Sequence, residues 1–204
     1  MKRIGVLISG RGTNLQALID AQQRGELGGE IVIVISNKSK ALGLERARRV
    51  GIKTAVVTKK QYPVREDHDR AVVQILKEHG VDLVVLAGYM RILTEVFIDA
   101  FRDRIINVHP SLLPAFKGVK AQWQAVEYGV KVSGCTTHFV TLEMDAGPII
   151  LQKAVPVFDD DTGETLADRI LPEEHKILVE SVRLFCEDRL RIEGRKVRIL
   201  QDEW

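Results

Sequence analysis

The sequence predicts an α/β fold in which a Rossmann-like parallel sheet forms the first half, a mixed or antiparallel sheet forms the second half, and helices cover both faces. Three observations lead to this fold class. Apolar runs alternate with segments of helical spacing along the first half of the chain. The runs at 31–35 and 81–87 are nearly unbroken, as in parallel strands buried on both faces. The segments 132–140 and 149–157 alternate in polarity, which favours antiparallel strands.

The individual elements follow from the same patterns. Strands are predicted at 4–8, 31–35, 55–57, 81–87, 105–109, 132–140 and 149–157, with a last edge strand at 196–200. Helices are predicted at 14–24, 41–50, 65–79, 94–101 and 121–128, with Thr94 as the cap of the fourth. A longer helical segment covers 164–190, and Pro172 is expected to interrupt it. Nothing resembling a linker or a repeat divides residues 1–204, so one domain is expected.

Composition excludes several classes of function. The chain has 204 residues, a formal net charge of +2, and hydrophobic and charged fractions of 45% and 28%, which are ordinary for a globular protein. Its basic residues are scattered among acids, so no nucleic-acid surface is expected. No apolar run approaches the ~20 residues of a membrane span. Cys135 and Cys186 are far apart and form no metal pattern, which fits two free thiols in the cytoplasm.

The segment 105–114, Ile-Ile-Asn-Val-His-Pro-Ser-Leu-Leu-Pro, is the first candidate for chemistry. Side chains alternate along a strand, so Asn107 and His109 are expected on one face, and Pro110 ends the strand directly after them. Ends of strands in α/β sheets commonly carry function. An amide donor beside a protonatable imidazole suits a developing oxyanion. The alternative for His109 is an ordinary structural histidine.

The turn Ser-Gly-Arg-Gly-Thr-Asn at 9–14 is the second candidate, because it joins a predicted strand to a predicted helix. Free backbone N–H groups at a helix start favour an anion, so a phosphate site is expected there. A dinucleotide fingerprint would need glycine at Leu15 and an acid where Ser36 and Asn37 stand, which argues against NAD. The remaining alternative is a turn with a structural role only.

Other polar residues give weaker signals. Asp145 lies in a turn between two predicted strands, where an aspartate often makes only local hydrogen bonds. His68, His79 and His175 lie in charged helical segments and are expected to be solvated. His138 lies in an alternating strand and is expected in the core or behind a site rather than as a catalyst.

Several segments together resemble the phosphoribosylglycinamide formyltransferases, a family of folate-dependent enzymes of purine biosynthesis. They are 9–17, 86–93, 107–114, 134–136, 138–140 and 145–152, and similar segments extend from residue 1 to about residue 181. The resemblance implies the single-domain formyltransferase fold, with a ribonucleotide-phosphate half at 1–100 and a folate-binding, catalytic half at 101–204. It implies transfer of a formyl group from 10-formyltetrahydrofolate, as co-substrate, to the amine of 5-phosphoribosylglycinamide.

The resemblance also assigns roles to residues. It makes Asn107, His109 and Asp145 catalytic, and it places the ribonucleotide at Gly12, Thr13, Asn14 and Glu174. It gives folate a longer set made of a pocket wall, a closing loop and flanking groups: Arg65, Met90, Arg91, Ile92, Leu93, Asn107, Thr141, Leu142, Glu143, Met144 and Asp145.

The chain departs from the family pattern at two places. Leu171 and Pro172 are apolar where polar residues are common, and Lys117 and Lys120 stand where proline and histidine often appear. The resemblance implies small-molecule substrates, no metal, no nucleic-acid or membrane partner, a cytoplasmic location, and a monomer or homodimer.

The implied reaction is a direct attack of the amine on the formyl carbon. Asn107 and protonated His109 would stabilise the oxyanion, while Asp145 would orient His109 and help to move the proton. Two alternatives of other classes remain, a hydrolase that deformylates the same folate and a non-catalytic nucleotide-binding domain. Formyl transfer to transfer RNA is less favoured, because no further basic domain is apparent.

Overall fold

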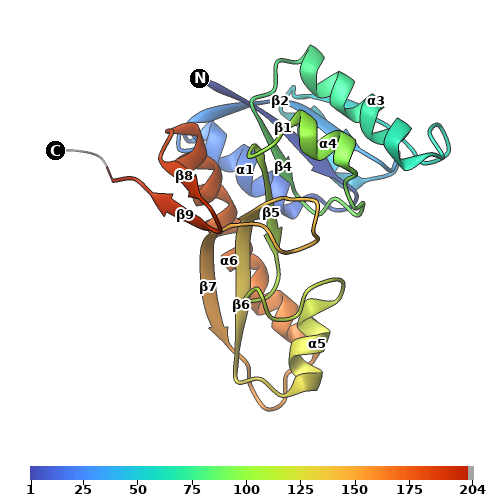
Figure 1. Cartoon of the computed structure of the whole chain (residues 1–204). Coiled ribbons are helices and arrows are strands. Elements are labelled where there is room, and N and C mark those ends of the chain that lie inside the picture. Colours follow the sequence, from blue (N-terminus) through green and yellow to red (C-terminus); the bar gives the residue numbers. More distant parts are fainter. Residues whose placement is uncertain (202–204) are drawn as a thin grey trace.

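A nine-stranded sheet with the order β3-β2-β1-β4-β5-β6-β7-β9-β8 runs through the computed structural model, which describes residues 1–201 (Figure 1). The strands are β1 Lys2–Ile8, β2 Gly29–Ser36, β3 Lys53–Val56, β4 Leu83–Leu86, β5 Ile105–His109, β6 Val132–Phe139, β7 Ile149–Pro156, β8 Leu190–Glu193 and β9 Lys196–Ile199. The helices are α1 Thr13–Gln23, α2 Leu42–Arg49, α3 Arg65–Glu78, α4 Glu95–Ala100, α5 Ala121–Tyr128 and α6 Gly163–Cys186. The predicted single-domain α/β fold with a mixed sheet is confirmed.

The change from parallel to antiparallel pairing occurs where the sequence predicts it. Strands β1 to β5 pair in parallel, whereas β6 is antiparallel to β5 and β7 is antiparallel to β6. Strand β1 lies between β2 and β4, so the chain reverses its direction of travel across the sheet there. The carboxyl ends of strands beside such a reversal form the usual ligand crevice of open α/β sheets.

Two apolar cores lie on opposite faces of the sheet. One joins α1, α2, α5 and α6 to inward residues such as Val6, Val85 and Ile106. The other joins α3 and α4 to residues such as Leu7, Val84 and Ile105. Neighbouring residues of each central strand therefore enter different cores, which explains why these strands read as nearly continuous apolar runs.

The C-terminal region differs from the prediction. Helix α6 continues through Pro172, so the expected interruption is wrong. Proline removes one helical hydrogen bond, but its ring is exposed here, and buried Ile170 and Leu178 hold the helix on the core. The helix also ends at Cys186, and the sequence prediction missed strand β8. Strand β9 is consequently not the edge strand, because β8 lies outside it.

The start of α4 also differs in detail. Thr94 lies at the N-cap position, as predicted, but its side chain makes no cap hydrogen bond. Its backbone N–H and its hydroxyl both donate to a carboxylate oxygen of Asp69, each at 2.7 Å. His68, expected to be solvated, is fully buried, with a bond of 2.7 Å between Nε2 and the Val57 carbonyl. Helix α3 therefore buries two polar side chains, His68 and Asp69, although its charged sequence indicates an exposed helix.

We expect Asp69→Ala to lower the free energy of unfolding by about 2–3 kcal/mol, because it leaves a buried N–H and a buried hydroxyl without their charged acceptor. Urea denaturation measures the change. Asp67→Ala, on the exposed side of the same helix, is the matched control. Equal stability of the two variants would contradict the prediction.

Candidate active site

A cavity of about 700 Å³ opens where β4 and β5 end, large enough for a small-molecule ligand. Three chain segments form most of its lining: the irregular stretch after β4, the end of β5 with the loop that follows, and the loop between β6 and β7. Helices α1 and α6 complete it with Asn14 and Glu174. The cavity thus draws on residues from nearly the whole length of the chain.

One wall of this cavity is apolar and open. The side chains of Met90, Ile92, Leu142 and Met144 all line it, and they are 48–66% exposed. Large apolar side chains left exposed around a cavity indicate a binding surface for an apolar ligand group. Leu93 also lines the cavity, but it is only 5% exposed and is packed into the core.

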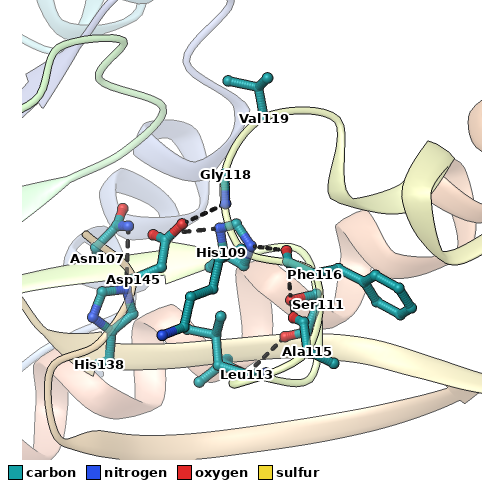
Figure 2. Close-up of polar contacts among 12 residues, drawn as sticks. Asn107, His109, Ser111, Leu113, Ala115, Phe116, Gly118, Val119, His138 and Asp145 are labelled. Atoms are coloured by element: carbon teal, nitrogen blue, oxygen red, sulfur yellow. Dashed lines mark hydrogen bonds and ion pairs between the residues drawn. The ribbon is translucent and has the colours of Figure 1, made fainter. Parts of the chain in front are cut away.

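Asn107 is oriented by its partner across the sheet. It lies directly opposite His138 in the β5–β6 pairing, and its Nδ2 is 3.3 Å from His138 Nε2 (Figure 2). His138 Nδ1 lies 3.1 Å from the Phe139 carbonyl, so Nδ1 carries the donated hydrogen and Nε2 is free to accept. Burial lowers the pKa of His138, which favours this neutral form. One N–H of Asn107 is therefore fixed, and the other remains for the cavity.

His109 is held from two sides. Its Nε2 donates to the Phe116 carbonyl at 2.8 Å, and its Nδ1 is 3.7 Å from Asp145 Oδ1 (Figure 2). The Ser111 hydroxyl donates to the carbonyls of Ala115 and Phe116. These bonds hold the turn that brings the Phe116 carbonyl back to His109. Because a carbonyl only accepts, Nε2 must carry a hydrogen, and Nδ1 is the ring nitrogen on the side of Asp145.

The Asp145 carboxylate has two neighbours. Its Oδ2 accepts the backbone N–H of Gly118 at 2.8 Å, while Oδ1 faces His109 (Figure 2). The side chains of His109 and Asp145 are only 7% and 9% exposed. Asp145 has φ 54°, a left-handed conformation that aspartate tolerates better than most residues. An amide, an imidazole and a carboxylate thus converge in the cavity.

The predicted ribonucleotide-binding residues lie at the start of α1 and on α6. Gly12 has φ 75° and precedes α1, and a Cβ there would lie 2.6 Å from Gly43 Cα. Its position therefore requires glycine for packing as well as conformation. Thr13 is the first residue of α1, whose start has no side-chain cap. Asn14 and Glu174 are both buried and line the cavity.

Burial raises the pKa of Glu174 to about 7, and a hydrogen bond from Asn14 opposes the rise. The Asn14 amide oxygen is buried and has no hydrogen-bond partner among the described residues. The cavity lining thus includes one buried polar atom, the Asn14 amide oxygen, whose bonding capacity is unmet.

Three predicted site residues lie outside the cavity lining besides Gly12. Thr13 is in the turn described above, Glu143 is exposed, and Arg65 is exposed at the start of α3. Arg65 nevertheless donates to the Ile92 carbonyl at 2.9 Å, so it contacts the backbone of a residue in the apolar wall. Arg91 and Thr141 belong to the lining itself.

Several lining residues were missed by sequence reasoning. Gly118, Val119 and Lys120 line the cavity, and so does His138. Gly118 acts through its N–H and Phe116 through its carbonyl, and backbone groups leave no side-chain signal in a sequence. The glycine at position 118 is the one hint in the sequence, and in the structure it has φ 85°. Lys120 reaches the cavity, whereas Lys117 does not line it.

No helix of residues 1–201 is both long and apolar enough to cross a membrane. Within the same residues, no group of three or more His, Cys, Asp or Glu side chains is arranged to hold a metal ion.

Comparison with known proteins places this chain and its α/β fold in a defined class. The chain belongs to the formyl transferase family, whose sequence profile matches residues 2–182. It is similar to the crystal structure of glycinamide ribonucleotide transformylase 1 from Symbiobacterium toebii, with 57% identity, a TM-score of 0.97, and coverage of 98% of this chain and 95% of that one.

Two further relatives extend the comparison. The phosphoribosylglycinamide formyltransferase of Escherichia coli is 43% identical, over 93% of this chain and 89% of its own length. The human trifunctional purine biosynthetic protein adenosine-3 is 46% identical over 98% of this chain. The chain spans only 20% of that human protein and 15% of its Chironomus tentans counterpart, which is 45% identical.

The buried carboxyl of Glu174 predicts a pH-dependent stability. Its raised pKa means that the folded state keeps the proton after the unfolded chain has lost it. The resulting stabilisation is complete below the ordinary value of 4.5 and is lost as pH rises through about 7. We expect Glu174→Gln to gain stability relative to the wild type across this range, by on the order of 3 kcal/mol at the alkaline end.

Urea denaturation at a series of pH values tests this expectation. Glu173→Gln is the matched control, because Glu173 is the preceding residue of α6 and forms a partly exposed ion pair with Lys176. A constant difference between Glu174→Gln and the wild type at every pH would show that the carboxyl does not titrate as expected.

Proposed function

We propose that the chain transfers the formyl group of 10-formyltetrahydrofolate to the amine of 5-phosphoribosylglycinamide, in the biosynthesis of purines. The products are formylglycinamide ribonucleotide and tetrahydrofolate. The observation that carries this proposal is the convergence of Asn107, His109 and Asp145 in a cavity that also has an apolar wall and the buried polar residues Asn14 and Glu174. The names of the similar proteins agree with it.

The two ends of the cavity suit the two substrates. The apolar wall, with Met90, Ile92 and Leu142, fits the flat ring of a folate. The uncapped start of α1 with Asn14 presents N–H groups to the phosphate of the ribonucleotide. Asn14 and Glu174 then face the ribose side of that substrate. The reacting amine and formyl carbon meet between these ends, beside His109.

The reaction begins when the lone pair of the neutral amine attacks the formyl carbon. A C–N bond forms, and the electrons of the C=O bond move to oxygen. The free N–H of Asn107 and the Nδ1–H of protonated His109 donate to this oxyanion. Removing one such donor typically costs about 10²–10³ in rate.

The tetrahedral intermediate collapses when the folate nitrogen leaves. The oxyanion electrons restore the C=O bond, the bond from carbon to the folate nitrogen breaks, and that nitrogen receives the proton lost by the attacking amine. Asp145 lies beside this path, and we propose that it transfers the proton, directly or through a water. The Phe116 carbonyl keeps His109 turned so that Nδ1 faces the reaction. The charges formed are handled by these side chains, so the proposed steps use no metal.

We further propose that residues 1–100 mainly hold the ribonucleotide phosphate and that residues 101–204 supply most of the catalytic groups. The partners are then the two small-molecule substrates, with no nucleic acid and no membrane. We propose a cytoplasmic location and a monomer or homodimer.

A direct assay tests the proposed reaction. The purified chain is mixed with 10-formyltetrahydrofolate, and release of tetrahydrofolate is followed with and without 5-phosphoribosylglycinamide. We expect release only with the ribonucleotide, and we expect His109→Ala to lower kcat by about 10²-fold or more. Release at the same rate without the ribonucleotide would identify a hydrolase. No release under either condition would refute catalysis.

The two ends of the cavity are expected to respond separately to substitution. Ile92→Asp places a charge against the folate ring and should raise the KM for folate about tenfold or more, with little effect on the ribonucleotide. Asn14→Asp places a negative charge at the phosphate end and should raise the KM for the ribonucleotide by a similar factor. Steady-state kinetics with each substrate varied measures both, and Ile92→Leu is the conservative control. Equal changes for both substrates in either variant would contradict the assignment of the ends.

A further inference from the structure

The hairpin of β8 and β9 contacts the loop that carries Asp145. Arg195 lies in the turn of this hairpin, and its Nη1 donates to the Ala146 carbonyl at 2.6 Å. Its Nη2 donates to the same carbonyl and to the Gly147 carbonyl, the latter at 3.3 Å. Strand β9 meets β7 at the pair Ile149 and Lys196, so the hairpin turn adjoins the start of β7 (Figure 1).

The loop between β6 and β7 has two arms, residues 141–144 before Asp145 and residues 146–148 after it. The two arms are fixed to different extents. Residues 141–144, on one side of Asp145, are exposed, and the one hydrogen bond found within them in the described chain joins the Thr141 hydroxyl to the Glu143 carbonyl. On the other side, the Phe139 N–H donates to the Pro148 carbonyl at 2.9 Å. Gly147 packs so tightly that a Cβ would lie 1.7 Å from the Phe139 oxygen. The arm after Asp145 is therefore the one that locates it.

Arg195 acts on this locating arm at its first two carbonyls. Asp145 has φ 54°, a conformation that a non-glycine residue keeps only when its surroundings hold it. A guanidinium offers several donors in a fixed plane, which suits two adjacent carbonyls better than a lysine ammonium does. The guanidinium is thus the one side-chain group, among the described residues, that bonds the carbonyls directly after Asp145.

We infer that Arg195 is a positioning residue for the formyl transfer, which it supports by holding the Ala146 and Gly147 carbonyls and thereby the Asp145 carboxylate beside His109. The inference rests on the proposed function. It follows because a displacement of about 1 Å of a catalytic group can cost about 10²-fold in rate, and the Asp145 carboxylate, 3.7 Å from His109 Nδ1, directly precedes the two carbonyls that Arg195 bonds. The turn of the C-terminal hairpin then supports catalysis through Arg195.

Kinetics of three hairpin variants test the inference. We expect Arg195→Ala to lower kcat on the order of tenfold, with the KM for the ribonucleotide unchanged. Arg195→Lys should recover part of the loss, since one ammonium can bond one carbonyl. Arg198→Ala is the matched control, because Arg198 lies on the same hairpin and bonds Glu193 at 3.2 Å within it. Equal kcat values for Arg195→Ala and Arg198→Ala would overturn the inference.

A double-mutant cycle shows whether Arg195 acts through Asp145. In the Asp145→Asn background, the further loss from Arg195→Ala should nearly vanish, because there is no carboxylate left to position. The same fold-loss in both backgrounds would mean that Arg195 only supports the fold and would overturn the inference.

Hydrogen exchange provides a readout that does not depend on activity. The amides of Ala146, Gly147 and Ile149 should exchange faster in Arg195→Ala than in the wild type or in Arg198→Ala, and unchanged exchange would overturn the inference. A wild-type protein without formyl transfer, but with this exchange difference, would refute the proposed function while leaving the contact itself established.

Discussion

The antiparallel pairing of β5 with β6 is the constraint on which the site depends. It sets Asn107 opposite His138 and His109 opposite Thr136, so all four side chains share one face of the sheet. A slip of one residue would turn Asn107 and His109 to the other face. Thr136 also accepts the Leu113 N–H and donates to the Ser111 carbonyl, which fixes the loop after β5. That loop then returns the Phe116 carbonyl to His109.

The extent of what the sequence predicts follows from the range of the interactions. Strand 105–109 and helix 121–128 match the structure at both ends, because local periodicity and the proline and glycine that follow them define them. The shared face of Asn107 and His109 follows from alternation alone. The contacts around Asp145 do not follow from local sequence, because they join residues that are 27 to 49 positions apart in the chain.

The errors have equally physical causes. His68 lies among charged residues, and a charged sequence indicates an exposed helix, but the buried face of α3 includes His68 and Asp69. Asp69 accepts from Thr94, and His68 bonds the Val57 carbonyl through Nε2, and neither partner is close to these side chains in sequence. The predicted interruption at Pro172 is wrong for a related reason, because core packing along α6 outweighs the one hydrogen bond that the proline removes. In both cases tertiary contacts override a local preference.

In the loop after β5, main-chain groups make the contacts to His109 and Asp145. The side chains at these loop positions can therefore vary without loss of the contacts. Gly118 contributes its N–H to Asp145, and Phe116 contributes its carbonyl to His109. The side chains of Lys117 and Lys120, where the sequence departs from the family pattern, make neither of these contacts. What the loop must keep is its backbone path, with φ 53° at Phe116 and 85° at Gly118. Glycine is favoured at the second position, because the left-handed region disfavours a Cβ. Lys120 also has a positive φ, of 53°, so its backbone belongs to this path although its side chain makes neither contact.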